Sequence, residues 1–225
     1  NLRQVIEIFL KYGMRYLTLY AFSTENWTRP RIEVKGLFRI LSEVIDREAR
    51  FLRDRGVQLR HLGSLNSLST SMKKRVVRAI EMTKDNDDMI VSVAFNYGGR
   101  TEILEAVRRI MAARIHPDDI DETLFAQHLY TAGLPDPDLV IRTGGEIRLS
   151  NFLLWQSAYS EYYATSAFWP DLNEADIEKA LRSYGQRQRR YGGVKSRKAK
   201  GPPDTVRICF GNDCWWPCSA FPSLL

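Results

Sequence analysis

Residues 16–22 read YLTLYAF, and residues 23–30 read STENWTRP. The first stretch is a compact run of aromatic and aliphatic residues, which predicts a buried strand. The second stretch is a polar loop, and it leads into an apolar periodic segment that predicts a long helix from about residue 32 to residue 55. A buried strand, a polar loop and a helix in this order favour an α/β fold.

The same alternation of strands and helices continues along the chain. Further strands or extended segments are predicted at 57–62, 89–95, 139–141, 152–156 and 162–165. Further helices are predicted at 1–13, 70–84, 101–114, 121–132 and 174–191. We therefore predict one α/β domain with a mostly parallel central sheet flanked by helices.

The composition is that of an ordinary globular protein, with 225 residues of which 44% are hydrophobic and 27% are charged. No apolar run approaches the roughly 18 residues that a membrane-spanning helix needs, which excludes an integral helical membrane protein. The net charge of +6 leans toward an anionic partner, although solubility alone explains a charge of this size.

The two ends of the chain differ from its middle. The sequence opens at Asn1 within a helical periodicity and without an N-cap, so we expect that part of the protein lies upstream. Residues 194–225 hold all three cysteines and four of the nine prolines. Their C-x4-C-x3-C spacing does not match a zinc site. We expect residues 1–193 to form the domain and residues 194–225 to be a disordered basic tail.

Polar loops follow three of the predicted strands, where ligands bind in open parallel sheets. The loop after Phe22 runs from Ser23 to Arg29 and carries hydroxyl, carboxylate, carboxamide, indole and guanidinium groups. One interpretation is a turn in which Ser23 and Asn26 cap the following helix. The presence of Trp27 in the loop favours the other interpretation, a binding site.

The loop after Ile141 carries two arginines, two hydroxyls and a glycine pair within residues 142–150. Guanidinium groups bind phosphate oxygens in pairs, and glycines let backbone N–H groups approach an anion, which together indicate a diphosphate site. A tight turn whose arginines pair with local acids fits the same spacing. Glu161 alone, in an aromatic stretch, is more typical of a solvated strand residue than of a metal ligand.

Several blocks, in this order, resemble the cis-prenyltransferases, the undecaprenyl diphosphate synthase type of isoprenyl transferase. The blocks are YAFSTENWTRP at 20–30, NYGGR at 96–100, DLVIRTGGEIRLSNF at 138–152, LLWQSAYSEY at 153–162 and FWP at 168–170. The resemblance implies transfer of isopentenyl units from isopentenyl diphosphate to an allylic diphosphate such as farnesyl diphosphate, with cis geometry. It also implies Mg2+, a homodimer and an apolar tunnel for the growing polyprenyl chain.

The resemblance also implies roles for individual residues. Asn26 would take part in removing the proton from isopentenyl diphosphate, with Ser23 helping to relay it, and Glu161 would help to hold Mg2+. The remaining residues would bind substrate: Ser23, Thr24, Glu25, Trp27, Arg29, Arg142, Arg148, Leu149 and Ser150.

One family feature has no counterpart in the chain. The family begins with a strand and an Asp-Gly-Asn-Gly-Arg-Trp loop that carries a catalytic Asp, and nothing here matches it. We therefore expect the fold to lack that first strand and diphosphate loop, and the chain as given to be nearly inactive. The alternative function is a non-catalytic dimerising subunit, although such a subunit needs none of Asn26, Arg142 or Glu161.

Partners and location follow from the same features. A nucleic-acid partner is not expected, because no reading motif accompanies the basic residues. We expect a cytoplasmic protein. Its basic helix at 72–84 has two interpretations, a transient contact with an anionic membrane surface or simply a solvated face.

Overall fold

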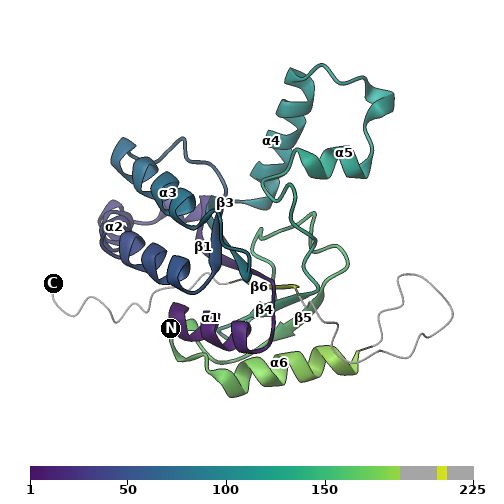
Figure 1. Cartoon of the computed structure of the whole chain (residues 1–225). Helices are drawn as coiled ribbons and strands as arrows, with labels where there is room; N and C mark the ends of the chain where they lie inside the picture. Colours follow the sequence, from purple (N-terminus) through teal and green to yellow (C-terminus); the bar gives the residue numbers. More distant parts are fainter. Residues whose placement is uncertain (188–206, 212–225) are drawn as a thin grey trace.

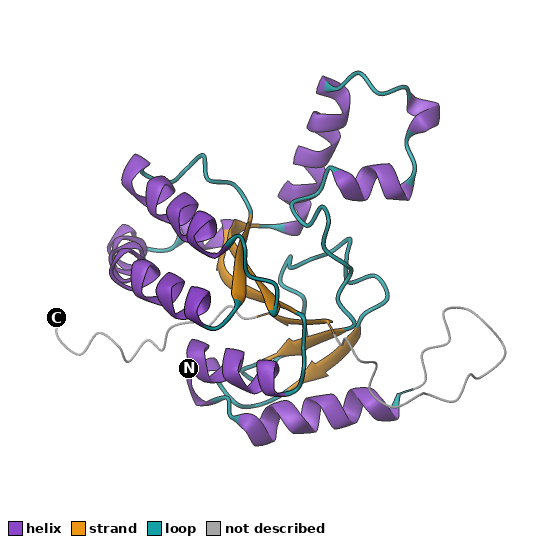
Figure 2. Ribbon diagram, in the orientation of Figure 1, coloured by secondary structure: helices purple, strands orange, loops and turns teal. Residues whose placement is uncertain are grey.

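The computed structural model describes residues 1–187 and 207–211, and these carry one sheet of six strands. The strand order is β2-β3-β1-β6-β4-β5, and every neighbouring pair is parallel (Figures 1 and 2). The strands are β1 (Tyr16–Ser23), β2 (Val57–Leu62), β3 (Met89–Tyr97), β4 (Leu139–Arg142), β5 (Glu161–Ala164) and β6 (Arg207–Gly211). The prediction of a largely parallel α/β sheet is confirmed.

Helices alternate with the strands, as the sequence predicts. The α-helices are α1 (Leu2–Lys11), α2 (Arg31–Asp54), α3 (Thr70–Thr83), α4 (Gly99–Ala112), α5 (Glu122–Gln127) and α6 (Glu174–Gln186). The 3-10 helices are η1 (Thr24–Thr28), η2 (Pro117–Asp119) and η3 (Trp169–Asp171). Within the described ranges, no helix is both long enough and apolar enough to cross a bilayer.

The two faces of the sheet are covered differently. Helices α1, α2, α3 and α6 cover one face, where the main apolar cluster includes Phe9, Leu19 and Ile177 (Figure 1). A smaller cluster on the other face packs Tyr20 against Phe152, whose rings are stacked with centroids 4.5 Å apart. Loops rather than helices therefore cover the second face.

The structure differs from the sequence prediction in local detail. Residues 152–156, predicted as extended, form turns, and Leu153 there has a positive φ of 44°. The helix predicted at 121–132 is shorter, because α5 ends at Gln127. An apolar run can bury its side chains against a sheet without itself forming a strand. In residues 152–156, Phe152 and Leu153 are buried in this way.

Strand β6 is the largest difference from the prediction. It lies within the segment expected to be a disordered tail, yet it pairs with β1 on one side and with β4 on the other. Ile208, Cys209 and Phe210 are each at most 2% exposed. The expectation is therefore wrong for residues 207–211, and the rest of residues 188–225 lies outside the described residues.

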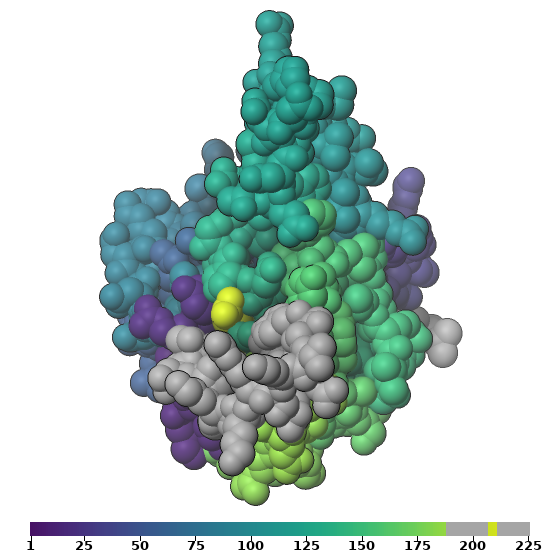
Figure 3. All heavy atoms as spheres, turned by 90° about the vertical axis from the view of Figure 1, so that its right-hand side faces the viewer, coloured from purple at the N-terminus to yellow at the C-terminus, as the bar shows by residue number. Residues whose placement is uncertain are grey.

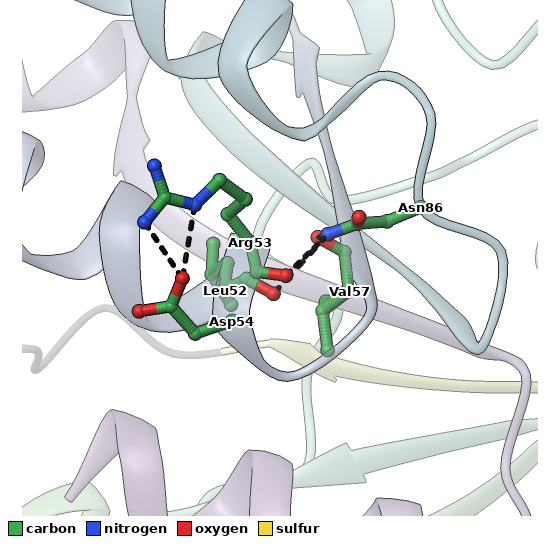
Figure 4. A network of polar contacts seen from close by, with 5 residues as sticks. All are labelled: Leu52, Arg53, Asp54, Val57 and Asn86. Carbon is green, nitrogen blue, oxygen red and sulfur yellow. Dashed lines mark hydrogen bonds and ion pairs between the residues drawn. The ribbon is translucent and has the colours of Figure 1, made fainter.

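The far end of α2 is fixed to the start of β2 by one side chain. The Asn86 amide donates to the carbonyl oxygens of Leu52, Arg53 and Val57, at 3.3, 3.1 and 3.0 Å (Figure 4). The Leu52 and Arg53 carbonyls belong to the end of α2 and also accept from the Arg55 and Gly56 backbone N–H groups, whereas Val57 begins β2. The last turn of α2 is thus held in place relative to the sheet.

Helices α4 and α5 project from the rest of the molecule, as Figures 1 and 3 show from two directions. One face of α4 exposes Leu104, Val107 and Met111, with exposed fractions of 56%, 41% and 71%. Positions three and four apart lie on the same side of a helix, so these side chains form one apolar stripe.

Candidate active site

The carboxyl end of β1 continues directly into the loop that carries most of the predicted site residues. Ser23 is buried and is the last residue of β1, opposite Tyr97 of β3. Its backbone N–H donates to the Asn26 side-chain oxygen at 2.9 Å, which forms part of a capping box at the start of η1. Ser23 and Asn26 therefore cap the short η1 and not the long helix α2, whose N-cap is Pro30, and the capping box fixes the Asn26 amide at the edge of the sheet.

Trp27 anchors this loop to the next strand. Its indole N–H donates to the Asn96 side-chain oxygen at 2.7 Å, and its ring packs at 5.3 Å from both Phe22 and Phe38. Asn96 has a positive φ of 53°, a conformation that asparagine tolerates better than most residues. The indole is thus held by one polar contact and two aromatic contacts, and it is part of the wall of the site.

Asn151 joins three loops at the same edge. Its amide N–H donates to the Glu25 carboxylate at 2.7 Å, and its side-chain oxygen accepts from the Arg100 backbone N–H at 2.9 Å. Its carbonyl accepts from the Gly99 backbone N–H at 2.7 Å. The loops that follow β1, β3 and β4 therefore converge on one asparagine.

The Glu25 carboxylate is stabilised in its ionised form. Burial opposes ionisation, but hydrogen bonds from the Glu25 backbone N–H and from the Asn151, Thr24 and Ser23 side chains outweigh it, so the pKa of Glu25 lies below its ordinary value. The Thr24 hydroxyl lies 3.1 Å from this carboxylate. Arg29 follows at the end of η1, so Thr24, Glu25 and Arg29 all belong to this one loop.

Arg142 ends β4 and is buried, with its side chain only 7% exposed. One guanidinium N–H donates to the Glu146 carboxylate at 2.9 Å, and Arg148 approaches the same carboxylate at 2.5 Å. The hydrogen bond from Arg142 is the largest cause of the lowered pKa of Glu146. Two guanidinium groups therefore converge on one oxyanion, as they would on a diphosphate.

The glycine pair of this loop shapes the turn and does not present free amides. Gly144 and Gly145 have positive φ angles of 87° and 76°. Their N–H groups donate to the Ala167 and Thr165 carbonyls, at 2.9 and 2.8 Å. The idea that these two amides approach an anion is therefore not supported, and the arginines remain the anion-binding groups of the loop.

The last residues of the loop divide between core and surface. Leu149 packs against the cluster of Tyr20 and Phe152, beneath the loop. Ser150 has a positive φ of 49° and is partly buried. The Thr143 hydroxyl is buried and has no hydrogen-bond partner among the described residues, which makes it a further polar group available at this edge.

Glu161 does not join this group. It begins β5, where its register partner is Leu139 at the start of β4, so it lies at the amino edge while Arg142 lies at the carboxyl edge. Arg187 donates to its carboxylate at 2.6 Å. In the part of the chain that the structure describes, no cluster of three His, Cys, Asp or Glu side chains could hold a metal. The described residues therefore do not fit a Mg2+ ion held by side chains alone.

An apolar cavity is lined in part by Phe22, whose ring packs against Trp27. Its volume is 220 Å³, and it runs between α2, α3 and the sheet. Phe22 and Phe95 line it near the carboxyl edge, and Leu2, Ile6 and Leu52 line its other end. A hydrocarbon chain is suited to such a space, because filling a mostly apolar cavity with hydrocarbon removes apolar surface from water and breaks few polar interactions.

Asn96 and Asn151 are the site residues that sequence reasoning missed. Each occurs in a quoted block, but an asparagine in a polar loop is ordinary, and the sequence does not show that it bridges loops. The available signal is the residue type itself, because asparagine tolerates a positive φ in turns; Asn96 and Asn151 both adopt one, with φ of 53° and 60°.

A parallel sheet whose carboxyl edge carries two guanidinium groups on one carboxylate, with an apolar cavity that reaches the same edge, is the arrangement expected of a protein that binds an amphiphile with an anionic head. The family model described as "Putative undecaprenyl diphosphate synthase" matches residues 1–192. The chain therefore belongs to this prenyltransferase family, and it is a transferase of prenyl groups.

Individual relatives agree with the family. The isoprenyl transferase of Heliobacterium mobile is 48% identical over 199 residues, which cover 87% of this chain and 76% of that protein. A crystal structure described as a probable undecaprenyl diphosphate synthase from Campylobacter jejuni superposes with a TM-score of 0.78 at 32% identity, covering 85% of this chain and 89% of that one.

A plant relative has the same fold. Lavandulyl diphosphate synthase from Lavandula x intermedia, solved in complex with dimethylallyl diphosphate, superposes with a TM-score of 0.81 at 36% identity and covers 85% of each chain.

Proposed function

We propose that the chain transfers isopentenyl units from isopentenyl diphosphate to an allylic diphosphate such as farnesyl diphosphate, with cis geometry, to make a polyprenyl diphosphate. The observation that carries this proposal is the placement of Arg142 and Arg148 at the carboxyl edge of the sheet, the same edge toward which Phe22 and Phe95 line one end of the 220 Å³ apolar cavity. A diphosphate head and a hydrocarbon tail need these two environments next to each other.

In this reaction the allylic C–O bond breaks and releases inorganic diphosphate, a new C–C bond forms to isopentenyl diphosphate, and the proton that leaves the isopentenyl unit is taken up by the released diphosphate. Arg142, Arg148 and Ser150 bind the diphosphate of isopentenyl diphosphate. Asn26 orients the departing proton, and Ser23 helps to relay it. Guanidinium groups fixed by the fold stabilise the negative charge without having to reorganise during the reaction.

The rest of the proposed site surrounds the substrates. Thr24, Glu25, Trp27 and Arg29 line the pocket from the β1 loop, and the backbone of Leu149 supports the diphosphate loop. Mg2+ remains part of the proposal because it is commonly bound through substrate phosphates together with only one or two carboxylates. Glu161, the ligand that the family resemblance implies, pairs with Arg187 at the amino edge of the sheet, so breaking that ion pair alone would not bring it to the diphosphate loop.

Replacing Asn26 by alanine is expected to lower the rate of isopentenyl transfer by about a hundredfold, the lower range for a positioned proton-transfer group. Binding of isopentenyl diphosphate should change little. Incorporation of radiolabelled isopentenyl diphosphate, with farnesyl diphosphate and Mg2+, measures the rate, and calorimetry measures binding.

The exposed Asn66→Ala variant is the matched control for the Asn26 experiment. A loss confined to binding would contradict the proton-transfer role of Asn26. Because the chain as given is expected to be nearly inactive, the rates are compared in a chain preceded by the family's Asp-Gly-Asn-Gly-Arg-Trp segment. Absence of incorporation by that chain, when it is folded, would instead favour the non-catalytic dimerising subunit. The expectation that the chain as given is nearly inactive stays a prediction, and this assay tests it.

We also propose that the protein forms a homodimer through the apolar stripe of Leu104, Val107 and Met111 on α4. A stripe this exposed on a projecting helix is typical of an interface. Substituting Val107 and Met111 together by aspartate should convert the dimer to a monomer in sedimentation experiments. The control Val77→Asp, on α3 and 55% exposed, should leave the dimer intact. A parent chain that sediments as a monomer would contradict this proposal.

A further inference from the structure

The apolar cavity carries a carboxylate at its inner end. Its lining follows the sheet from Phe95, toward the carboxyl edge of β3, to Val91, toward the amino edge, which we call the inner end. At that inner end α1 meets the second half of α2, and Glu48 of α2 lines the cavity there together with Leu2 and Leu52. The lining is apolar apart from Glu48, Arg60 and His61. A carboxylate in such a wall requires an explanation, because a charged group is costly to bury beside hydrocarbon.

Glu48 is held in place by two arginines. Its carboxylate lies 2.9 Å from the guanidinium groups of both Arg3 and Arg47, and its side chain is only 15% exposed. The Arg3 guanidinium also lies over the Phe51 ring, 4.8 Å from its centroid. Arg3 thus connects α1 to α2 across the inner end of the cavity.

The carboxylate stays ionised in this position. Burial alone would raise the pKa of Glu48, but the hydrogen bonds from Arg3 and Arg47 outweigh it, and the pKa lies below its ordinary value. Asn86, through its contacts with the Leu52 and Arg53 carbonyls, fixes the helix end just beyond Glu48.

We propose that the Arg3–Glu48 ion pair is the barrier that sets the greatest length of prenyl chain the cavity accepts. This inference rests on the proposed function, because it assumes that the cavity holds a prenyl chain. A hydrocarbon tail that reached Glu48 would strip water from an ion pair that keeps part of its hydration, with no polar contact in return. The tail therefore stops at the pair, and growth beyond that length becomes unfavourable.

Equilibrium binding of a series of prenyl diphosphates tests this barrier without requiring turnover. We would measure the affinities of farnesyl diphosphate, geranylgeranyl diphosphate and prenyl diphosphates lengthened by one isoprene unit at a time. The method is calorimetry in the absence of isopentenyl diphosphate. Affinity should rise with each added unit up to a limiting length and then level off in the parent chain. Each isoprene unit that enters the cavity buries five carbon atoms, so it should tighten binding by at least about tenfold and at most about a thousandfold.

The informative variant is Glu48→Leu, which continues the apolar wall past the barrier. We expect its limiting length to increase by at least one isoprene unit, with about tenfold tighter binding of the first ligand beyond the parent's limit. Glu43→Leu is the matched control, because Glu43 lies on the same helix, is 66% exposed and does not line the cavity. Arg3→Leu is a second variant, which removes the α1 side of the pair and should also raise the limit.

The outcomes separate this inference from the function on which it rests. A parent chain that shows no dependence of affinity on prenyl length would overturn the proposed function, and the barrier with it. If the parent chain shows a limiting prenyl length, and both Glu48→Leu and Arg3→Leu leave that length unchanged, the barrier alone is overturned. Thermal unfolding of each variant identifies one that has lost its fold, and the other variant then decides.

Discussion

A chain shortened by removing residues 207–225 is expected to lose cooperative unfolding, because strand β6 lies between β1 and β4 in the sheet. Without it, both neighbouring strands expose a row of unpaired N–H and C=O groups. The side chains of Ile208 and Phe210 leave the core as well, and each contributes roughly 1.5–3 kcal/mol by its burial. These losses together approach the whole stability of a typical domain, about 5–15 kcal/mol.

The Phe210→Ala variant measures the same contribution within the intact chain. Phe210 is fully buried, and its ring contacts Phe9 and Trp169 at centroid distances of 5.8 and 5.3 Å. Its truncation should lower the free energy of unfolding by about 3–5 kcal/mol, as is usual for a buried phenylalanine. Denaturant titration followed by circular dichroism provides the measurement.

Two controls make the β6 prediction sharp. Phe168→Ala removes a side chain that is 56% exposed, and it should change the unfolding free energy by about 0.5 kcal/mol or less. A chain in which Cys214 and Cys218 are serine retains Cys209 as its single thiol. Burial raises the pKa of Cys209, so this thiol should react with a thiol reagent only on unfolding. Rapid reaction in native buffer would show that β6 is not part of the sheet.

The sequence predicts elements whose signal is local. The run that became β1 is a compact group of apolar and aromatic residues, and residues 57–62 match β2 at both ends. Strand β1 is predicted to within one residue, because Ser23 extends it beyond Phe22. In both strands the pattern of apolar residues and the intrinsic strand propensity favour the same structure. Both strands can therefore be predicted from local sequence, without knowledge of the fold.

Features that depend on distant partners could not be predicted in this way. Strand β6 has only five residues, in a segment rich in Lys, Pro and Cys, and only the gap between β1 and β4 makes it a strand. Glu161 lies near the diphosphate loop in sequence but at the opposite edge of the sheet, because the parallel register pairs it with Leu139. The bridging role of Asn151 likewise appears only when three loops are brought together.

Replacing Arg142 by alanine is expected to weaken binding of isopentenyl diphosphate by about 2 to 3 kcal/mol, which is on the order of a hundredfold. The guanidinium is buried at the end of β4 and therefore needs little reorganisation to bind an anion. Its present partner, Glu146, also pairs with the exposed Arg148. Calorimetric titration with isopentenyl diphosphate measures the dissociation constant directly, without relying on turnover.

The Arg142 experiment decides between the two interpretations of the loop at 142–150. Arg142→Lys keeps the charge but not the planar fork, so a diphosphate site predicts an affinity between those of the parent and the alanine variant. Arg182→Ala, which removes a 77% exposed guanidinium from α6, should leave the affinity unchanged. If Arg142→Ala also binds isopentenyl diphosphate as the parent does, the guanidinium serves only the ion pair with Glu146. The loop is then a tight turn held by its own charges, and the anion must be bound elsewhere on the sheet edge.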